Sequence, residues 1–213
     1  MILRPMILIG VTGGIACGKT EVCRVFQKRG AFILSGDEFG KEVVEKNKKV
    51  RNQLVRTFGK AILNKNKTLN RRKLGQLAFA SKESKDKLNK IIHPYLLKKL
   101  KKRIENLRRR LDLGLVVVDA ALIVEWGLHN ELDHIIFVES KREDKIRRLH
   151  KHRGYSREEA LDRIKSQLPE TAKKKLADFV IINDKGLPEL KKKAEKVFSR
   201  LVGTPPTRAT QSG

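Results

Sequence analysis

A glycine-rich segment near the N-terminus constrains this chain more than any other feature. Residues 10–20 read Gly-Val-Thr-Gly-Gly-Ile-Ala-Cys-Gly-Lys-Thr, directly after an apolar run at 6–9. From Gly13 to Thr20 the segment matches the pattern G-x-x-x-x-G-K-[ST] at every fixed position. Such a loop needs glycines because its backbone curls around a phosphate with the N–H groups pointing inward, where a Cβ would block the path. Residues 13–20 are called the phosphate loop below.

The residues around the phosphate loop complete an anion site. A helix expected from about 20 to 27 adds the positive end of its dipole. Lys19 can reach the β- and γ-phosphates, and the Thr20 hydroxyl can ligate Mg²⁺. The alternative is a glycine-rich turn with a chance Lys-Thr pair, but a buried strand before the loop and a helix after it favour the first interpretation. The segment therefore predicts binding of a nucleoside triphosphate with magnesium.

Length and composition indicate a globular protein. A chain of 213 residues with 39% hydrophobic residues can bury a full core and need not contain more than one α/β domain with insertions. No apolar run approaches the roughly 20 residues of a membrane span, and no segment of signal-peptide type is seen, so we expect a cytoplasmic protein without a membrane partner. Cys17 and Cys23 are expected to be reduced side chains rather than a disulfide or metal site.

The net charge of +25 arises from 49 basic residues against 24 acids. The excess concentrates at 98–110, where eight lysines and arginines accompany one acid, Glu105. Such a patch can bind nucleic acid through phosphate contacts, or steer small polyanionic substrates to the protein. We favour the solvated face of a helix, because one apolar stripe runs through the same region. The stripe comprises Leu96, Leu97, Leu100, Ile104, Leu107 and Leu111.

Strand and helix signals alternate along the chain. Apolar runs at 7–11, 31–34, 115–118, 135–138 and 179–182 predict five strands. With a phosphate loop after the first strand, the pattern predicts the α/β fold of P-loop NTPases, a mostly parallel five-stranded sheet flanked by helices. A closing helix is expected at 187–202, with Pro188 in its first turn. The core is expected at about 6–37 and 114–202, followed by a disordered tail at 203–213.

The long interval between the second and third strands carries no strand signal, so residues 38–113 are predicted to form a helical insertion. Helices are expected at 38–58 with a break at Asn47 and Lys48, at 71–80 and at 84–92, with a loop or turn at 59–70. His93-Pro94 is predicted to interrupt the helical pattern before the basic helix, with Pro94 in the first turn of that helix.

Two acids follow predicted strands. Asp37 comes shortly after the second strand, and residues at the carboxyl ends of parallel strands face the ligand crevice of an open α/β sheet. Asp37 is therefore placed to do chemistry, and helix N-capping is a compatible role. Asp119 closes the third strand, an arrangement of Walker B type in which the carboxylate lies near Mg²⁺ or its waters.

A basic helical hairpin is expected at about 141–168. Its helices, 141–152 and 157–168, are joined by a turn at Gly154, and Ser156 with Glu159 forms a capping box for the second. The arginines of this hairpin suit a lid that closes on phosphates through bidentate contacts. They are Arg147, Arg148, Arg153, Arg157 and Arg163. The alternative is surface ion pairing of these arginines with Glu158, Glu159 and Asp162.

Taken in order, these residues resemble the dephospho-coenzyme A kinases over about residues 7–202. The motifs that carry the resemblance are the phosphate loop, Asp37, residues 58–59, 70–71 and 88–94, Asp119 with Leu122 and Glu125, and residues 153–156, 163–167 and 177–183. The resemblance implies transfer of the γ-phosphate of ATP to the ribose 3′-hydroxyl of dephospho-coenzyme A, the last step of coenzyme A synthesis. The family usually carries Asp-x-Asp after the second strand and Asp-x-Pro-Leu-Leu after the third. Here Ser35 replaces the first acid and Ala121 the proline.

The resemblance also implies roles for single residues. Asp37 is expected as the base for the acceptor hydroxyl, with Lys19, Arg148 and Arg153 acting on the transferring phosphate. The acceptor contacts are expected from Asp37, His93, Asp119, Leu122 and Arg163, and Mg²⁺ ligation from Thr20 and Asp119. The nucleotide contacts are expected from Thr12, Gly13, Gly14, Ile15, Ala16, Cys17, Gly18, Lys19, Thr20, Glu21 and Asn183.

Two other functions remain open from the sequence. A nucleoside or nucleoside monophosphate kinase shares the phosphate loop, an acid after the second strand and an arginine-bearing lid. The charge also suggests an ATP-dependent nucleic-acid-binding protein. We rank it last, because no known DNA- or RNA-reading motif is present and aromatic residues at 5% leave few stacking platforms. The sequence makes no prediction of the oligomeric state.

Overall fold

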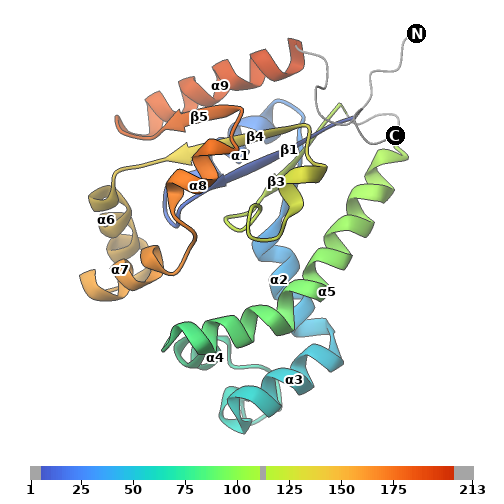
Figure 1. Ribbon diagram of the computed structural model, residues 1–213, viewed down its shortest axis with the longest axis vertical. Helices are drawn as coiled ribbons and strands as arrows, with labels where there is room; N and C mark the ends of the chain where they lie inside the picture. The colour runs from blue at the N-terminus through green and yellow to red at the C-terminus, as the bar shows by residue number, and fades with distance from the viewer. Residues whose placement is uncertain (1–5, 111–113, 204–213) are drawn as a thin grey trace. The chain divides into compact units, whose positions relative to one another are not determined.

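A five-stranded, fully parallel sheet is the framework of the first of two compact units (Figure 1). The computed structural model describes residues 6–110 and 114–203. The strands lie in the order β2-β3-β1-β4-β5. Their bounds are Ile7–Gly13 for β1, Phe32–Ser35 for β2, Leu115–Asp119 for β3, His134–Glu139 for β4 and Phe179–Ile182 for β5. The predicted fold class is confirmed, and each strand overlaps its predicted run.

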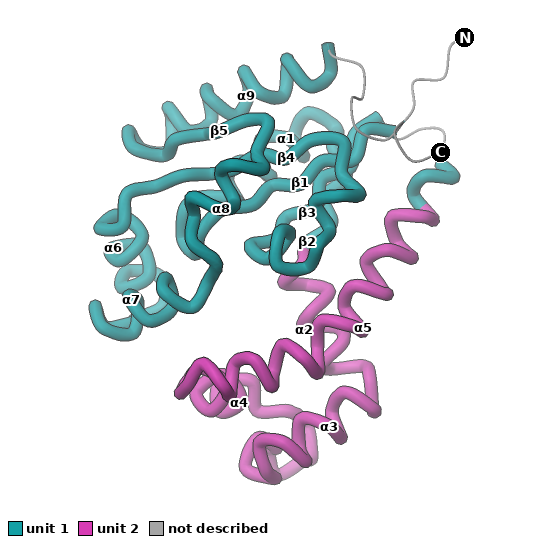
Figure 2. Tube along the Cα trace, in the orientation of Figure 1, with its two compact units in different colours: residues 1–35, 107–213 teal, residues 36–106 magenta. Residues whose placement is uncertain are grey.

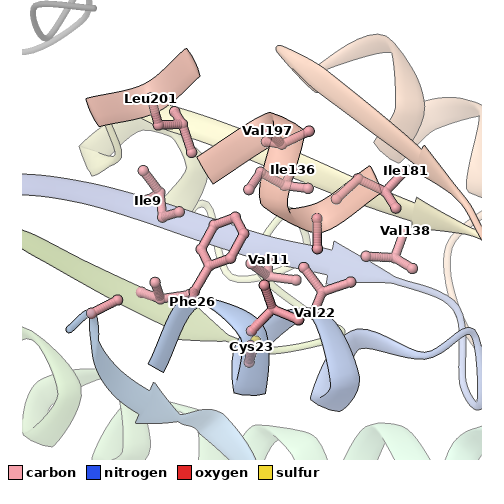
Figure 3. Packing of buried hydrophobic residues seen from close by; sticks show 14 of the residues in the cluster. Ile9, Val11, Val22, Cys23, Phe26, Ile136, Val138, Ile181, Val197 and Leu201 are labelled. Atoms are coloured by element: carbon pink, nitrogen blue, oxygen red, sulfur yellow. The ribbon is translucent and has the colours of Figure 1, made fainter. Parts of the chain in front are cut away.

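The middle strands are buried on both faces, which is why they read as continuous apolar runs. On one face, Ile9 and Val11 pack against Phe26 of α1 (Lys19–Lys28) and Val197 of α9 (Leu187–Gly203), as Figure 3 shows. On the other face, Gly10 leaves room for side chains that follow β3: an added Cβ would lie 2.6 Å from Leu132 and 2.8 Å from Ile123. The sheet therefore places the end of β1 in a rigid, fully packed setting.

Two aspartates fix the register where β4 and β5 begin. Asp133 precedes β4, and its carboxylate accepts a hydrogen bond of 2.7 Å from the Leu8 amide of β1. Asp178 precedes β5 and accepts one of 2.7 Å from the Ile135 amide of β4. Each carboxylate satisfies an amide at the open end of a neighbouring strand, so the strands pair without a slip.

The second compact unit, Gly36–Asn106, interrupts the first, which takes residues 1–35 and 107–213 (Figure 2). It contains α2 (Gly36–Lys46), α3 (Lys48–Phe58), the short helix η1 (Lys60–Ile62), α4 (Arg71–Ala78) and most of α5 (Lys82–Arg108). Asn47 causes the predicted break, because its side chain caps α3 by accepting from the Lys49 and Val50 amides. Helices and the turns that join them make up the described part of this unit, together with one isolated bridge between Leu63 and Leu69.

The predicted interruption at His93-Pro94 is wrong, because α5 runs through both residues. Proline removes a single N–H donor, here toward the Lys90 carbonyl, at a cost of about 3 kcal/mol in a helix interior. The apolar stripe holds the helix beyond that point, since Leu96, Leu100, Ile104 and Leu107 are all buried. Most of the basic residues at 98–110 are exposed, which is the solvated helix face that we favoured. Leu111 lies outside the described residues.

The C-terminal part of the first unit contains the predicted helical hairpin, α6 (Arg142–Arg153) and α7 (Arg157–Lys165), with Gly154 at φ 65° between them. The capping box of Ser156 and Glu159 is present as predicted. Ile146, Leu149 and Ala160 form a small apolar core to which Ile15 of the phosphate loop also contributes. A helix that the sequence did not predict, α8 (Glu170–Lys175), follows the hairpin.

A short helix, η2 (Leu128–Glu131), lies between β3 and β4. Of the tail predicted at 203–213, Gly203 belongs to α9 and residues 204–213 lie outside the described residues. No helix in the described part of the chain has the length and apolar character to cross a membrane.

Replacement of Pro94 with alanine is expected to stabilise the protein. The substitution restores the amide donor toward the Lys90 carbonyl in the interior of α5, and alanine is the strongest helix former. We expect the free energy of unfolding to rise by about 1–3 kcal/mol, measured by urea denaturation. A lower stability of Pro94→Ala would show that proline is required at this position in the helix.

Candidate phosphate-binding site

The phosphate loop links the end of β1 to the start of α1 through residues with left-handed backbone angles. Gly13 has φ 148°, Ala16 has φ 57° and Gly18 has φ 109°. Glycine is needed for space as well as for φ: a Cβ on Gly13 would collide with the Val138 carbonyl, and one on Gly18 would lie 2.6 Å from Asn183 Nδ2. The loop therefore follows the path that the motif predicted.

Donors from distant parts of the chain bind the loop carbonyls. The Arg148 guanidinium donates to the Ala16 carbonyl at 3.0 Å, and Asn183 Nδ2 donates to the Cys17 carbonyl at 2.9 Å. Because a carbonyl and the next N–H point to opposite sides of one peptide plane, Asn183 also sets the direction of the Gly18 amide. Lys19 Nζ donates to the Gly13 and Gly14 carbonyls at 3.1 and 3.0 Å. The result is a preformed loop with the positive end of α1 behind it, which is an anion site.

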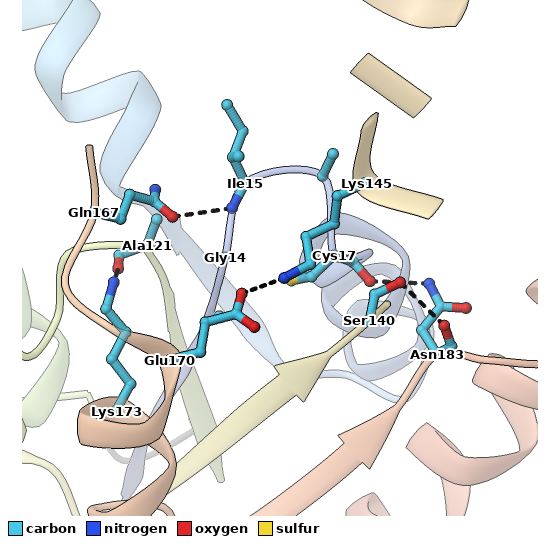
Figure 4. A network of polar contacts seen from close by, with 12 residues as sticks. Gly14, Ile15, Cys17, Ala121, Ser140, Lys145, Gln167, Glu170, Lys173 and Asn183 are labelled. Carbon is cyan, nitrogen blue, oxygen red and sulfur yellow. Dashed lines mark hydrogen bonds and ion pairs between the residues drawn. The ribbon is translucent and has the colours of Figure 1, made fainter. Parts of the chain in front are cut away.

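Ser140 ties two of these donors together, as Figure 4 shows in part. Its buried hydroxyl donates to the Asn183 backbone carbonyl at 3.1 Å and accepts from the Arg148 guanidinium at 3.0 Å. Ser140 directly follows β4, and Asn183 directly follows β5. The carboxyl ends of these two strands thus supply the support for the phosphate loop, as expected for a parallel sheet.

Asp119 lies at the carboxyl end of β3, in register with Val11 of β1 and Ser35 of β2. Its carboxylate is hydrogen-bonded to the Cys23 thiol of α1. Burial raises the pKa of this thiol well above its usual value, and the Asp119 charge raises it further. Cys23 is therefore a protonated donor at neutral pH, and it orients an acid beside the phosphate loop.

The oxygen ligands available around the phosphate loop fit Mg²⁺. This ion prefers oxygen ligands, and it usually takes one or two from the protein and the rest from phosphates and water. Thr20 is exposed in the first turn of α1, next to the phosphate loop, and Asp119 offers a carboxylate at the end of the neighbouring strand. A hydroxyl and a carboxylate are suitable ligands of this kind.

The other predicted site residues of the first unit take various positions. Thr12 is buried and donates to the Ala121 carbonyl at 3.4 Å, Glu21 pairs with Arg24 within α1, and Leu122 is half-buried after β3. Arg153 ends α6 and is exposed, while the Arg163 guanidinium lies 5.0 Å from the centre of the Tyr155 ring. Arg157 pairs with Glu143 at 2.7 Å, which is an ion pair other than the predicted alternative of pairing with Glu158, Glu159 and Asp162.

Two predicted site residues belong to the second unit. Asp37 is exposed in the first turn of α2, which begins one residue earlier at Gly36, so Asp37 does not have the N-cap position. His93 is half-buried on α5. The structure thus brings together the phosphate loop, Arg148, Asn183 and Asp119 within one unit.

Several polar residues of the site were missed, or quoted without a role (Figure 4). Gln167 Oε1 accepts from the Ile15 amide at 3.0 Å, and Lys145 forms an ion pair of 2.5 Å with Glu170. Lys173 pairs with Glu125 at 2.7 Å and donates to the Ala121 carbonyl at 2.6 Å. Lys145 and Lys173 are buried lysines, which nothing distinguishes in so basic a sequence.

A parallel sheet with a phosphate loop after its first strand, and an arginine-bearing helical hairpin tied to that loop, defines a P-loop kinase fold. A family model described as Dephospho-CoA kinase matches residues 7–189. A dephospho-CoA kinase of Syntrophus aciditrophicus is 34% identical over 197 residues, covering 92% of this chain and 84% of the relative. The chain belongs to the dephospho-CoA kinase family.

Solved structures agree with the fold. A crystal structure from Thermus thermophilus superposes with a TM-score of 0.73 at 30% identity, covering 93% of this chain and 98% of that one. A shikimate kinase of Bacteroides thetaiotaomicron, at 14% identity and a TM-score of 0.56, shares the fold over 92% of this chain and 98% of that one. The family assignment confirms the resemblance found in the sequence, and with it the class of enzyme, an ATP-dependent kinase with an alcohol acceptor.

Substitution of Gly18 by alanine is expected to weaken nucleotide binding. The change introduces both backbone strain at φ 109° and a contact of 2.6 Å with Asn183 Nδ2, which would displace the donor to the Cys17 carbonyl. We expect the dissociation constant of ADP to rise at least about tenfold by calorimetry, because strain at such a position amounts to about 1–3 kcal/mol.

Gly30→Ala is the matched control for this prediction. Gly30 has φ 91°, but an added Cβ there meets nothing within 4 Å. The control should lose stability through strain alone and bind ADP normally. Equal ADP affinities of Gly18→Ala and the wild type would contradict the role given to Asn183.

Proposed function

We propose that this chain transfers the γ-phosphate of ATP to the ribose 3′-hydroxyl of dephospho-CoA to give CoA. The observation that carries the proposal is the preformed phosphate loop with Lys19 at its end, in a member of the dephospho-CoA kinase family. The relatives that share this sequence over most of their length bear the name of that activity.

The phosphate loop would bind the triphosphate. Its amides and the N-terminus of α1 stabilise negative charge, and Lys19 Nζ would exchange the Gly13 and Gly14 carbonyls for phosphate oxygens. Arg148 already holds the Ala16 carbonyl, so its guanidinium lies beside the loop where charge on the transferring group can be stabilised. Arg153, at the end of the same helix, would add a second positive charge to stabilise the transferring group.

Mg²⁺ would be held by Thr20 and Asp119. When bound, the ion supplies charge neutralisation across the β- and γ-phosphates. The protein's own contribution is to orient the two ligands: Thr20 by the first turn of α1, and Asp119 by the Cys23 thiol.

Asp37 would be the base. It follows Ser35 by two residues, and Ser35 is the register partner of Asp119 at the carboxyl end of the sheet. Two residues span at most about 7 Å along the chain, so Asp37 originates close to this edge. A carboxylate within hydrogen-bond reach of the acceptor hydroxyl can orient it and take its proton. His93, Leu122 and Arg163 would contribute acceptor contacts.

The proposed reaction is tested by incubating the protein with ATP and dephospho-CoA, with mass spectrometry to place the new phosphate. We expect CoA phosphorylated at the ribose 3′ position. A panel of nucleosides and nucleoside monophosphates provides the comparison. Phosphorylation of a panel member with dephospho-CoA inert would favour the second kinase function instead.

Asp37→Asn should lower kcat by about 10²-fold or more, because the amide keeps the size of the side chain but cannot take a proton. The dissociation constant of ADP should be unchanged, since the phosphate loop is untouched. Unchanged turnover in this variant would remove Asp37 from the mechanism.

Chelation of divalent metal should stop the reaction. We expect EDTA to abolish CoA formation and added Mg²⁺ in excess to restore it, because the phosphate charge is otherwise not neutralised. In Asp119→Asn the Mg²⁺ concentration for half-maximal rate should increase several-fold, since a carboxylate ligand is lost. Full activity in the presence of EDTA would contradict the metal assignment.

A further inference from the structure

The chain that returns from the helical hairpin to the sheet makes polar contacts with three separate parts of the site. This return segment, Gln167–Lys173, includes the start of α8. Gln167 accepts from the Ile15 amide, Glu170 pairs with Lys145, and Lys173 donates to the Ala121 carbonyl (Figure 4). The segment therefore connects the phosphate loop, the first helix of the hairpin and the loop after β3.

The Lys145–Glu170 pair lies at the centre of these contacts. Nζ and Oε1 are 2.5 Å apart, and the lysine side chain is only 4% exposed. The pair rests on Gly14: a Cβ added there would collide with Glu170 Oε1 and lie 3.4 Å from Lys145 Nζ. An ion pair thus fills the place beside the phosphate loop that a side chain at residue 14 would take.

Burial of Lys145 makes this contact sensitive to the loss of Glu170, whose own side chain is 32% exposed. Removing Glu170 would leave the buried ammonium of Lys145 unpaired in a poorly solvated place, and the surroundings would rearrange to solvate it. Glu170 lies next to Gly14, and three residues before it in the chain is Gln167, which accepts from the Ile15 amide. A rearrangement at Glu170 would therefore reach the phosphate loop directly.

We propose that Lys145 and Glu170 are positioning residues for nucleotide binding, which hold the phosphate loop in its binding conformation by clamping the return segment against Gly14. The proposal rests on the proposed function only in that the loop binds a nucleotide. It assigns a role to α8 that goes beyond linking the hairpin to β5. A merely structural pair would affect the melting temperature and leave nucleotide affinity unchanged.

The test uses the full chain with Glu170→Gln, Lys145→Met and the double variant. We expect each single variant to raise the dissociation constant of ADP about tenfold by calorimetry, since small misplacements of a binding group have effects of this size or larger. Without nucleotide, hydrogen exchange of the amides at residues 14–18 should be faster in each single variant than in the wild type. The double variant should bind ADP no more weakly than the worse single variant, because the two residues act as a unit.

Lys174→Met is the matched control on the same helix. It removes an exposed lysine–glutamate pair, Lys174 with Glu139 at 2.8 Å, whose side chains are 45% and 32% exposed. We expect its ADP affinity to stay within twofold of the wild type. Glu170→Gln keeps the size and hydrogen-bonding capacity of the side chain, so it carries the test if Lys145→Met does not fold.

Wild-type ADP affinity and amide exchange in Glu170→Gln would overturn the proposal. So would an equal loss of affinity in the Lys174→Met control, because it would show that any change on α8 has this effect. Dephospho-CoA left unphosphorylated by a wild-type protein whose variants still respond as expected would contradict the proposed function and leave the clamp supported.

Discussion

The hydrogen bonds that hold the carbonyls of the phosphate loop are the constraint on which the rest of the site depends. A loop with left-handed residues at 13, 16 and 18 has no regular hydrogen-bonding pattern of its own. Its conformation is set by Arg148 and Asn183, which come from parts of the chain more than 130 residues away. These donors fix the peptide planes before any ligand binds, so the loop amides need little reorganisation when a phosphate arrives.

The fold supplies these donors through the parallel sheet. Ser140 and Asn183 follow β4 and β5, which run parallel to β1 and end at the same edge of the sheet. The register of both strands is fixed at their opposite ends by Asp133 and Asp178. Because the strands are rigid and packed on both faces, the residues at their carboxyl ends are placed with little freedom. The register of the sheet therefore determines where the residues that hold the phosphate loop are placed.

Most of the framework was predictable from local patterns. Five apolar runs predicted the strands, Asn47 marked a helix break, Ser156 marked a helix start through its capping box, and the glycines of the phosphate loop predicted its path. The prediction at Pro94 is wrong because the local preference of proline competes with the burial of an apolar stripe along α5, and burial has the larger effect. The contacts of Arg148 and Asn183 depend on which strand ends meet, which no local pattern contains.

The helix α8 and the two buried lysines were beyond sequence reasoning for a different reason. Residues 170–175 read Glu-Thr-Ala-Lys-Lys-Lys, a polar stretch without apolar periodicity. Lys145 and Lys173 are buried because each meets a glutamate from another element, at 2.5 and 2.7 Å. A lysine carries no mark of its own burial, and in a chain with 49 basic residues only the three-dimensional pairing distinguishes these two.

The central claim is that the phosphate loop presents the terminal phosphate of ATP to an acceptor hydroxyl activated by Asp37. A crystal structure with a non-hydrolysable ATP analogue and dephospho-CoA tests it most directly. We expect the β- and γ-phosphates to lie against the amides of residues 13–20, and the Asp37 carboxylate to lie about 3 Å from the ribose 3′-hydroxyl. A complex in which the phosphates bind elsewhere, or in which another group contacts that hydroxyl while Asp37 remains in solvent, would contradict it.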